Sequence, residues 1–428
     1  MKDTLNIAVA GLGTVGGGIV NLINDNHDLI NKKTGKNVCL YAVSDLDASK
    51  CPPGVKFYKD ALAMTADENV DIVVELIGGT GFAKDLVLSS IHNKKHVVTA
   101  NKALLADFGN EIVREAEANS VSLGFEASVA GCIPIIHALK GEMASNNISQ
   151  LFGIMNGTCN YILSTMEKTG RDFKEVLAEA QKLGYAEAEP SLDIDGHDTA
   201  HKLAILTSLA FHMPLNKKDI YVEGIRNISK YDIVYAKDLG YKIRLLGIAR
   251  KLDSDNIAAY VFPCFVKNDT TVAAINGAYN YINVRGDFAD DVSFIGRGAG
   301  ASPTATAVMS DIMDIASETV SRPLIHSFND LRSCRVQKML DYEGTYYLRI
   351  RSVDRVGVLS KITNSLSANN ISIESMIQRD VDADGYALVF FTLHKTKEAN
   401  IQKVLDELEK TEEIVERPCI VRIVNLDG

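Results

Sequence analysis

Hydrophobic and polar positions follow three different patterns along the chain. In about the first third, short apolar runs are separated by helical stretches, which is typical of parallel strands covered by helices. The expected strands are residues 5–10, 38–43, 72–76, 96–99 and 122–125. This region is therefore predicted to form a doubly wound α/β domain.

A second pattern runs from about residue 131 to residue 300, where longer helices are mixed with β-rich runs. Helical periodicity covers residues 174–183 and 198–211, and the β-rich runs cover residues 243–249 and 257–266. We expect an α+β substrate domain here.

Residues 304–315 again have helical periodicity. We expect this helix to return to the first domain and pack on it. Residues 301–340 would then complete the domain built from residues 1–130, and residues 131–300 would form the second domain.

The third pattern follows a break at residues 341–345 and has the order strand, helix, strand, strand, helix, strand. This order predicts a compact ferredoxin-like domain over residues 346–428. Its expected elements are residues 346–353, 358–368, 371–378, 386–393, 400–408 and 420–424.

Composition narrows the classes of function. The 428 residues include 45 basic and 55 acidic side chains, for a net charge of −10 without a long single-sign run, which argues against nucleic acid as a partner. The N-terminus lacks a secretory pattern, and no uncharged stretch reaches the ~18 residues of a membrane span. The seven cysteines never form a CxxC pair, which argues against a disulfide framework or a zinc site. We expect a cytoplasmic protein with no membrane partner.

A glycine-rich turn follows the first expected strand. Gly11, Gly13 and Gly16 form a GxGxxG sequence that opens a helical stretch, and this context favours a dinucleotide site over a glycine-rich turn without a ligand. Gly11 would permit the tight turn, Gly13 the approach of the pyrophosphate, and Gly16 the close packing of the helix. The helix N-terminus, at Thr14 and Val15, would face the anion. A Rossmann-type site for NAD or NADP is predicted.

The end of the second expected strand bears on the choice between these cofactors. Asp45 could accept a hydrogen bond from the adenosine ribose and so favour NAD, although it lies 29 residues after Gly16 where about 20 is usual. No arginine stands beside Asp45 to pair with a 2′-phosphate, and Lys50 and Lys56 are weaker candidates. The preference stays open on these residues.

Candidate reacting groups occur in two places. Lys102 follows the expected strand at residues 96–99, at the edge where open α/β sheets bind their ligands. Asp198 and Lys202 lie one turn apart on a helix that continues with almost entirely apolar residues, so its first turn is expected to be anchored in the protein. Each lysine could instead be a solvated charge, and Asp198 with Lys202 a surface ion pair.

The segment around this pair, residues 184–202, resembles the signature segment of homoserine dehydrogenases. The resemblance covers about residues 5–320. Other matching stretches are residues 75–79, 99–105, 126–134, 156–158 and 298–304. Three positions depart from the family pattern: Glu189 replaces Asp, Asn or Ser, Cys132 replaces glycine, and Cys159 replaces threonine.

The resemblance implies NAD(P)H-dependent, reversible reduction of L-aspartate 4-semialdehyde to L-homoserine, a step in threonine, methionine and isoleucine biosynthesis. Position by position, it implies Asp198 and Lys202 as the catalytic pair and Glu187 and Asp193 as ligands of the substrate ammonium. We assign proton transfer to Lys202, orientation to Asp198, and the role of a second cation to Lys102. A lysine whose pKa is lowered by burial or by a neighbouring lysine would suit this chemistry.

The same resemblance extends to cofactor and cation sites. Glu126 and the carbonyls of Val129, Gly131 and Ile133 resemble the family's monovalent cation site, whose oxygen ligands suit a hard cation such as sodium in a structural role. Residues 131–300 would serve substrate binding, catalysis and dimerisation. The residues expected to bind the nicotinamide cofactor are Gly11, Gly13, Thr14, Val15, Gly16, Asp45, Lys102 and Gly300.

Residues 346–425 resemble an ACT domain, a ligand-sensing module of amino-acid biosynthetic enzymes. Residues 354–362 occupy the first strand-to-helix turn, where that family binds amino acids, and Gly357 would let the backbone approach a ligand. Threonine, the pathway end product, is the implied effector. The alternative is a structural or dimerising domain without a ligand. Such domains usually pair side by side, so a homodimer or homotetramer is expected.

Two rival functions remain open on the residues alone. An aspartate-semialdehyde dehydrogenase handles the same aldehyde but needs a nucleophilic cysteine, and no cysteine here has a convincing histidine partner in the sequence. A redox or amino-acid sensor could keep the nucleotide and ACT folds without catalysis. The joint presence of Lys102, Glu187, Asp193, Asp198 and Lys202 favours an enzyme.

Overall fold

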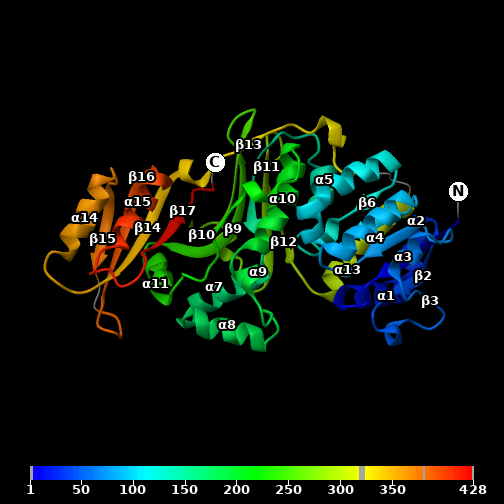
Figure 1. The fold of residues 1–428 in the computed structure, drawn as a ribbon, viewed down its shortest axis with the longest axis horizontal. Helices are drawn as coiled ribbons and strands as arrows, with labels where there is room; N and C mark the ends of the chain where they lie inside the picture. The colour runs from blue at the N-terminus through cyan, green and yellow to red at the C-terminus, as the bar shows by residue number, and fades with distance from the viewer. Residues whose placement is uncertain (1–2, 318–322, 379–380, 427–428) are drawn as a thin grey trace.

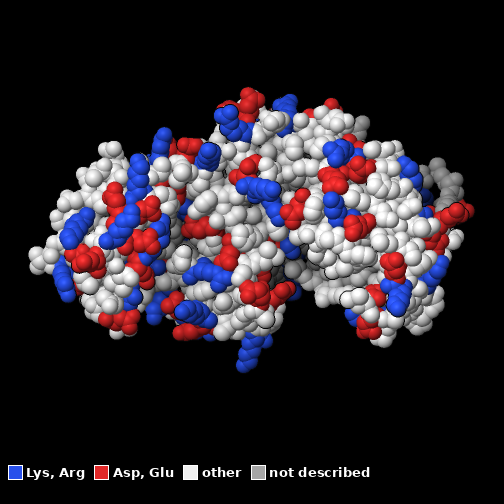
Figure 2. Space-filling model, in the orientation of Figure 1, with Lys and Arg blue, Asp and Glu red and all other residues white. Residues whose placement is uncertain are grey.

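The computed structural model describes residues 3–317, 323–378 and 381–426. The molecule is elongated, with the N-terminal and C-terminal domains at opposite ends of a central region (Figure 1). In the described ranges, no helix combines the length and the apolar character that a membrane crossing requires. On the face shown in Figure 2, acidic and basic side chains are interspersed.

The N-terminal sheet is parallel and has the order β3-β2-β1-β4-β5-β6. Its strands are β1 (Thr4–Ala10), β2 (Asn37–Ser44), β3 (Lys56–Phe57), β4 (Ile72–Glu75), β5 (His96–Thr99) and β6 (Leu123–Gly124). The five expected strands are confirmed, and β3 is additional. The strand order reverses between β1 and β4, which is the position where open α/β sheets bind their ligands.

Helices cover this sheet, and one of them comes from far along the chain. They are α1 (Thr14–Asp25), α2 (His27–Thr34), α3 (Ala61–Thr65), α4 (Gly81–His92), α5 (Lys102–Asn119) and α13 (Ala301–Ala316). α13 packs against α1, and its Val308 and Ile312 share one buried core with Val9 and Val74. The expected return of this helix to the N-terminal sheet is confirmed.

The central region combines helices with the long antiparallel strands β7, β9, β10, β11 and β12, while the short strands β8 and β13 pair in parallel with β10. Its helices are α6 (Ile135–Lys140), α7 (Gly157–Thr169), α8 (Phe173–Lys182), α9 (Ser191–Ile194), α10 (His197–Phe211), α11 (Lys230–Asp238) and α12 (Thr271–Ala274). Its strands are β7 (Ile148–Ile154), β8 (Tyr221–Val222), β9 (Tyr241–Lys251), β10 (Asn256–Lys267), β11 (Tyr279–Gly286), β12 (Asp290–Arg297) and β13 (Arg335–Val336). The expected helices at residues 174–183 and 198–211 correspond to α8 and α10. α10 is buried at almost every position and lies between α5 and β9.

The C-terminal domain has the expected βαββαβ order. Its elements are β14 (Glu343–Ser352), α14 (Val358–Ala368), β15 (Ile373–Gln378), β16 (Ala387–Lys397), α15 (Glu398–Leu408) and β17 (Cys419–Ile423). The strands have the order β17-β14-β16-β15, and the apolar side chains of Leu348, Ile350 and Phe391 pack with the two helices. The ferredoxin-like fold is confirmed.

The C-terminal sheet and the central sheet form one continuous sheet. β17 pairs in parallel with β10, where Cys264 lies opposite Arg422 and Phe265 opposite Ile423. β14 begins at Glu343, inside the expected break at residues 341–345. The two regions are therefore joined by backbone hydrogen bonds as well as by the connecting segment.

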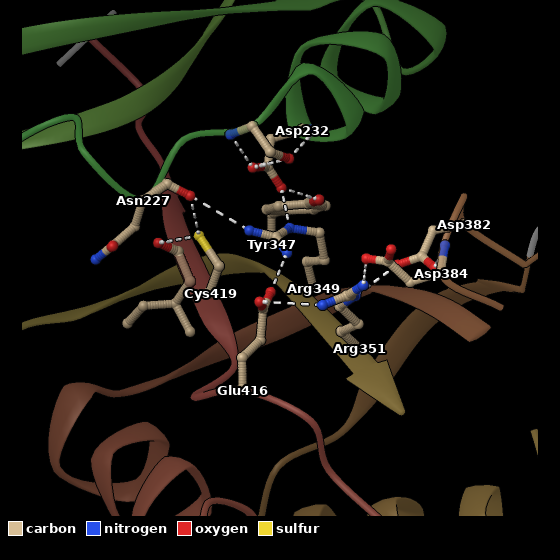
Figure 3. A network of polar contacts seen from close by, with 11 residues as sticks. Asn227, Asp232, Tyr347, Arg349, Arg351, Asp382, Asp384, Glu416 and Cys419 are labelled. Atoms are coloured by element: carbon tan, nitrogen blue, oxygen red, sulfur yellow. Dashed lines mark hydrogen bonds and ion pairs between the residues drawn. The ribbon is translucent and has the colours of Figure 1, made fainter. Parts of the chain in front are cut away.

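A buried polar contact reinforces this junction (Figure 3). Asp232 of α11 accepts hydrogen bonds from Tyr347 Oη at 2.5 Å and Arg349 Nε at 2.9 Å, both on β14. Burial opposes the charge on Arg349, but Asp232 holds the pKa of its guanidinium above the usual range. The ring of Tyr235, also on α11, stacks on Phe390. The C-terminal domain is thus docked on the central region through its helix-free face.

Candidate active site

The glycine-rich turn at the end of β1 leaves space for a ligand. Gly11 has a φ of +94°, and a Cβ atom there would lie 2.6 Å from the Leu76 carbonyl oxygen. A Cβ at Gly16 would lie 1.9 Å from the Gly11 carbonyl oxygen, whereas one at Gly13 would meet nothing within 4 Å. Gly11 and Gly16 therefore shape the turn. The open space at Gly13, before the first turn of α1, fits an anionic pyrophosphate.

Gly300 lies near this turn because α13 packs on α1. Thr14 and Val15 begin α1, while Gly300 immediately precedes α13 with a φ of +120°. A Cβ at Gly18 of α1 would come within 2.9 Å of the Ala301 carbonyl oxygen. The tertiary structure thus brings the 300–301 turn beside the predicted nucleotide loop.

Asp45 contacts the same turn. Its Oδ2 accepts a hydrogen bond from the Leu12 N–H at 2.6 Å, and its Oδ1 accepts one from Asp47 at 2.9 Å. The Asp47 N–H holds the pKa of Asp45 below its ordinary value. Lys50 pairs with Asp45 at 3.3 Å. A carboxylate and a cation therefore stand together where a ribose would be bound.

Lys102 begins α5 at the carboxyl end of β5. Asn101 caps this helix by accepting the Leu104 N–H at 3.0 Å, and its Nδ2 donates to the Gly79 carbonyl at 2.7 Å. The Thr99 hydroxyl donates to buried Glu75 at 2.6 Å. These bonds tie the ends of β4 and β5 together and fix the start of α5. Lys102 is thereby held at the sheet edge that faces α10.

Asp198 is the centre of the cluster. It is 3% exposed, and its Oδ2 accepts from Lys202 Nζ at 2.8 Å while its Oδ1 lies 3.1 Å from Lys102 Nζ. Burial opposes its ionisation, but the charges of Lys202 and Lys102 hold the pKa of Asp198 well below its usual range. Lys202 Nζ also donates to the Met155 carbonyl at 2.6 Å. Asp198 and Lys202 therefore form a buried pair, which excludes the simple surface ion pair.

Lys102, the expected second cation, is surrounded by acidic side chains. The negative charge of Asp198 raises the pKa of the Lys102 ammonium, and the charges of Asp193 and Glu187 act in the same direction. The attraction of these acidic neighbours outweighs the burial that opposes the charge on Lys102. Lys102 is consequently a permanent cation at neutral pH.

The charges of both expected substrate ligands, Asp193 and Glu187, act on Lys102. Burial raises the pKa of Asp193, and the nearby charge of Asp198 raises it further. Glu187 is exposed on the segment between α8 and α9. A group carrying a positive charge would be favoured here, because it would relieve the repulsion between the carboxylates.

Asn156 belongs to this cluster, although the sequence analysis assigns it no role. Its Nδ2 donates to Asp193 Oδ1 at 2.7 Å and to Asp198 Oδ2 at 2.8 Å. Neighbouring Cys159 is fully buried, and burial raises the pKa of its thiol far above the ordinary value. The only signal in the sequence was that Asn156 opens a stretch matching the family.

Glu126, the side chain expected to bind the cation, is buried. Glu126 accepts the peptide N–H groups of Ile136 at 2.9 Å and His137 at 2.6 Å. Burial raises the pKa of Glu126 to about 7. A hydrogen bond to Asp311 raises the pKa of His137 to about 9. A carboxylate has further lone pairs beyond these two bonds, so its oxygens and the adjoining loop carbonyls are chemically suited to a hard cation.

The predicted effector turn is open to solvent. Gly357 precedes α14 with a φ of +93°, and a Cβ there would meet nothing within 4 Å. Val356 is fully exposed. The backbone of this turn is therefore accessible to a small ligand.

Comparison with known proteins gives consistent matches over the whole chain. Residues 11–126 match the family model described as homoserine dehydrogenase, NAD binding domain, residues 134–313 the homoserine dehydrogenase model, and residues 346–413 the ACT domain. A homoserine dehydrogenase of Neisseria gonorrhoeae is 42% identical, with 99% of each chain covered.

Two solved structures extend this similarity to three dimensions. A homoserine dehydrogenase from Thiobacillus denitrificans has 38% identity and a TM-score of 0.92, with 99% of each chain covered. A homoserine dehydrogenase from S. aureus has 32% identity and a TM-score of 0.76, with both chains fully covered.

Proposed function

The chain belongs to the homoserine dehydrogenase family of NAD(P)-binding oxidoreductases, and from this premise we propose that Lys202, Asp198 and Lys102 carry out its reaction. The observation that supports this assignment is the buried Asp198 carboxylate, paired with both lysines within 3.1 Å. The aldehyde of L-aspartate 4-semialdehyde and the alcohol of L-homoserine would react beside these groups.

Glu187 and Asp193 would bind the substrate ammonium. Both are acidic, and the charge of each acts on Lys102. A bound ammonium would offset the mutual repulsion of Asp193 and Asp198. Substrate binding would thus place the positive end of the substrate at Asp193 and its reacting carbon toward the lysines.

Lys202 would exchange the proton with the reacting oxygen. Two of its three N–H groups donate to Met155 O and Asp198 Oδ2, which leaves one for the substrate. During reduction this ammonium would give its proton to the oxygen of the aldehyde. Lys102, a permanent cation, would stabilise the negative charge that develops on that oxygen.

Gly13, Thr14 and Val15 would hold the cofactor pyrophosphate at the N-terminus of α1, with Gly300 beside them. The bound nicotinamide supplies or accepts the hydride at its C4 atom.

The direct test of the proposed reaction is the initial rate of NADPH oxidation, and separately of NADH oxidation, with L-aspartate 4-semialdehyde. No turnover with either cofactor would contradict the proposed function. Activity that does not require phosphate separates this reaction from that of a semialdehyde dehydrogenase.

We expect Asp45→Asn to shift the cofactor preference toward NADP. The variant removes a negative charge that would repel the 2′-phosphate, while an amide oxygen still accepts the Leu12 N–H. Removing one such repulsion is expected to raise the ratio of kcat/KM for NADPH to that for NADH about tenfold. Steady-state kinetics with both cofactors measure this ratio. An unchanged ratio would place the 2′-position away from Asp45.

We propose that sodium binds Glu126 and the carbonyls of Val129, Gly131 and Ile133. Sodium at ten times its Kd should stabilise the folded protein by about 1.4 kcal/mol. Thermal unfolding in sodium chloride, compared with choline chloride at equal ionic strength, tests this. Glu126→Gln should abolish the difference between the salts. Equal melting temperatures of the wild-type protein in both salts would remove the proposed site.

We propose that the C-terminal ACT domain binds threonine at the turn preceding α14. The expected coupling of about 1–3 kcal/mol corresponds to a 5- to 150-fold change in substrate affinity. Millimolar L-threonine should lower activity and raise the melting temperature, and D-threonine is the matched control. If L-threonine changes neither, the domain has another ligand or a purely structural role.

The chain is proposed to contain three structural units. We propose a nucleotide unit of residues 1–130, a catalytic and dimerising unit of residues 131–300, and an ACT unit of residues 346–428. Of the expected residues 301–340, we propose that α13 completes the nucleotide unit, because β13 pairs with β10 of the central region. A homodimer or homotetramer is expected, and light scattering on the purified protein measures its mass.

A further inference from the structure

Asn156 connects the substrate side of the site to the catalytic side. A single carboxamide nitrogen donates one hydrogen bond to Asp193 and one to Asp198. Its oxygen accepts the Cys159 N–H at 2.8 Å and so caps α7. The residue is 4% exposed, so water cannot easily replace these bonds.

We propose that Asn156 is a positioning residue that holds the substrate-binding carboxylate of Asp193 and the orienting carboxylate of Asp198 in one fixed geometry. This inference rests on the proposed roles of Asp193, Asp198 and Lys202. A carboxamide suits the task because its two N–H groups can serve both acceptors at once and it carries no charge. The preceding residue, Met155, accepts a bond from Lys202. The junction of β7 and α7 therefore fixes all three groups.

Asn156→Asp separates this role from helix capping. The new carboxylate still accepts the Cys159 N–H, but it donates nothing and adds a third negative charge beside Asp193 and Asp198. Misplaced reacting groups commonly cost about 10²-fold in rate, so kcat/KM for homoserine should fall by about that factor. Displacement of Asp193 should raise KM, and displacement of Asp198 and Lys202 should lower kcat. The added negative charge should shift the acidic limb of the pH–rate profile to higher pH.

Two further variants complete the test. Asn156→Ser keeps an oxygen that can cap α7, but its side chain is too short to reach both Asp193 and Asp198. It should therefore lose activity, and because it adds no charge, its pH–rate profile should not shift. Asp172→Ala removes the cap of α8 and should leave kcat, KM and the pH profile unchanged. If Asn156→Asp keeps kcat/KM within threefold and the wild-type pH profile, Asn156 is only a cap. Activity retained in Lys202→Ala would instead overturn the underlying assignment.

An independent set of contacts links the C-terminal domain to α9, the short helix that carries Asp193. Residues 223–227 form a segment whose two ends are held by arginines of that domain. Arg422 Nη1 donates to Glu223 Oε2 at 2.5 Å, and Arg349 Nη2 donates to the Asn227 carbonyl at 3.3 Å (Figure 3 shows the second contact). Both arginines are buried.

The middle of the same segment holds α9. The Ile225 N–H donates to the Ile194 carbonyl at 2.8 Å, and Arg226 donates to Ser191 Oγ at 2.7 Å and Asp195 Oδ2 at 2.9 Å. A Cβ at Gly224 would lie 2.1 Å from Ile194 O, so the two backbones are in direct contact. We infer that residues 223–227 transmit displacements of the C-terminal domain to Asp193, and thereby to substrate affinity.

Glu223→Gln tests this coupling without requiring a known effector. The change weakens one end of the segment, so backbone amides of residues 192–196 should exchange hydrogen faster, and KM for homoserine should rise severalfold at nearly unchanged kcat. Glu416→Gln is the matched control, because Glu416 pairs with Arg349, while among the described residues its hydrogen bonds and ion pairs join it to arginines of the C-terminal domain and not to residues 223–227. Unchanged exchange and KM in Glu223→Gln, or an equal change in Glu416→Gln, would overturn the inference.

Discussion

Lys202→Ala is expected to lower kcat by about 10³-fold, the loss typical of removing a positioned proton donor. Asp198 would keep a cationic partner in Lys102, 3.1 Å away, so its charge would not be left unpaired. The fold should therefore survive, and the loss should appear in kcat more than in KM. Steady-state rates with L-homoserine and with L-aspartate 4-semialdehyde measure the effect in both directions.

Two control variants show whether the loss of kcat comes from the missing proton donor. Lys202→Arg keeps the positive charge but not a group that readily gives up a proton, so it should remain severely impaired. Lys182→Ala removes an exposed lysine of α8 and should behave as wild type. A Lys202→Ala enzyme with more than a tenth of wild-type kcat would assign the proton transfer elsewhere.

Asp232→Ala is expected to destabilise the folded protein by about 3–5 kcal/mol, because it leaves the buried Arg349 guanidinium without its main partner. Asp232 is completely buried and accepts bonds from both Tyr347 and Arg349. It also accepts the Ser229 N–H at 2.7 Å, which caps α11. Thermal or denaturant unfolding should show the transition of the C-terminal domain shifted to milder conditions.

Glu416→Ala is the comparison for unfolding stability, because Glu416 also pairs with Arg349. Glu416 is 43% exposed and pairs with Arg349 at 2.8 Å. A pair accessible to water contributes about 1 kcal/mol or less, so this variant should unfold almost as wild type does. Equal losses in Asp232→Ala and Glu416→Ala would show that burial does not control the strength of this network.

Much of the fold follows from local patterns that act over a few residues. α14 spans the residues expected from periodicity, and β5 does as well. In contrast, β7, β11 and β12 were not anticipated. β11 and β12 are antiparallel neighbours, and β12 alternates exposed and half-buried positions. Such a strand has no strong apolar face, and its pairing partner is what stabilises it.

Some features of the candidate site depend on residues close together in the sequence, and others depend on tertiary packing. The glycine-rich turn is local, since a positive φ at Gly11 and the close contact between Gly16 and the Gly11 carbonyl depend on adjacent residues. The pair of Asp198 and Lys202 follows from helical spacing. That Lys102 joins them, and that Asn156 bridges two carboxylates, depends on the packing of α5, α7 and α10.

The nucleotide turn, the five main strands of the N-terminal sheet, the element order of the C-terminal domain and the family could all be predicted from the sequence. The pairing of β10 with β17, the raised pKa of Lys102 and the contacts of Asn156 could be found only in the folded molecule. The two kinds of feature differ in the distance along the chain over which the underlying interactions act. Periodicity and backbone preference act between neighbours along the chain, whereas electrostatic and hydrogen-bond energies depend on distances that only folding sets.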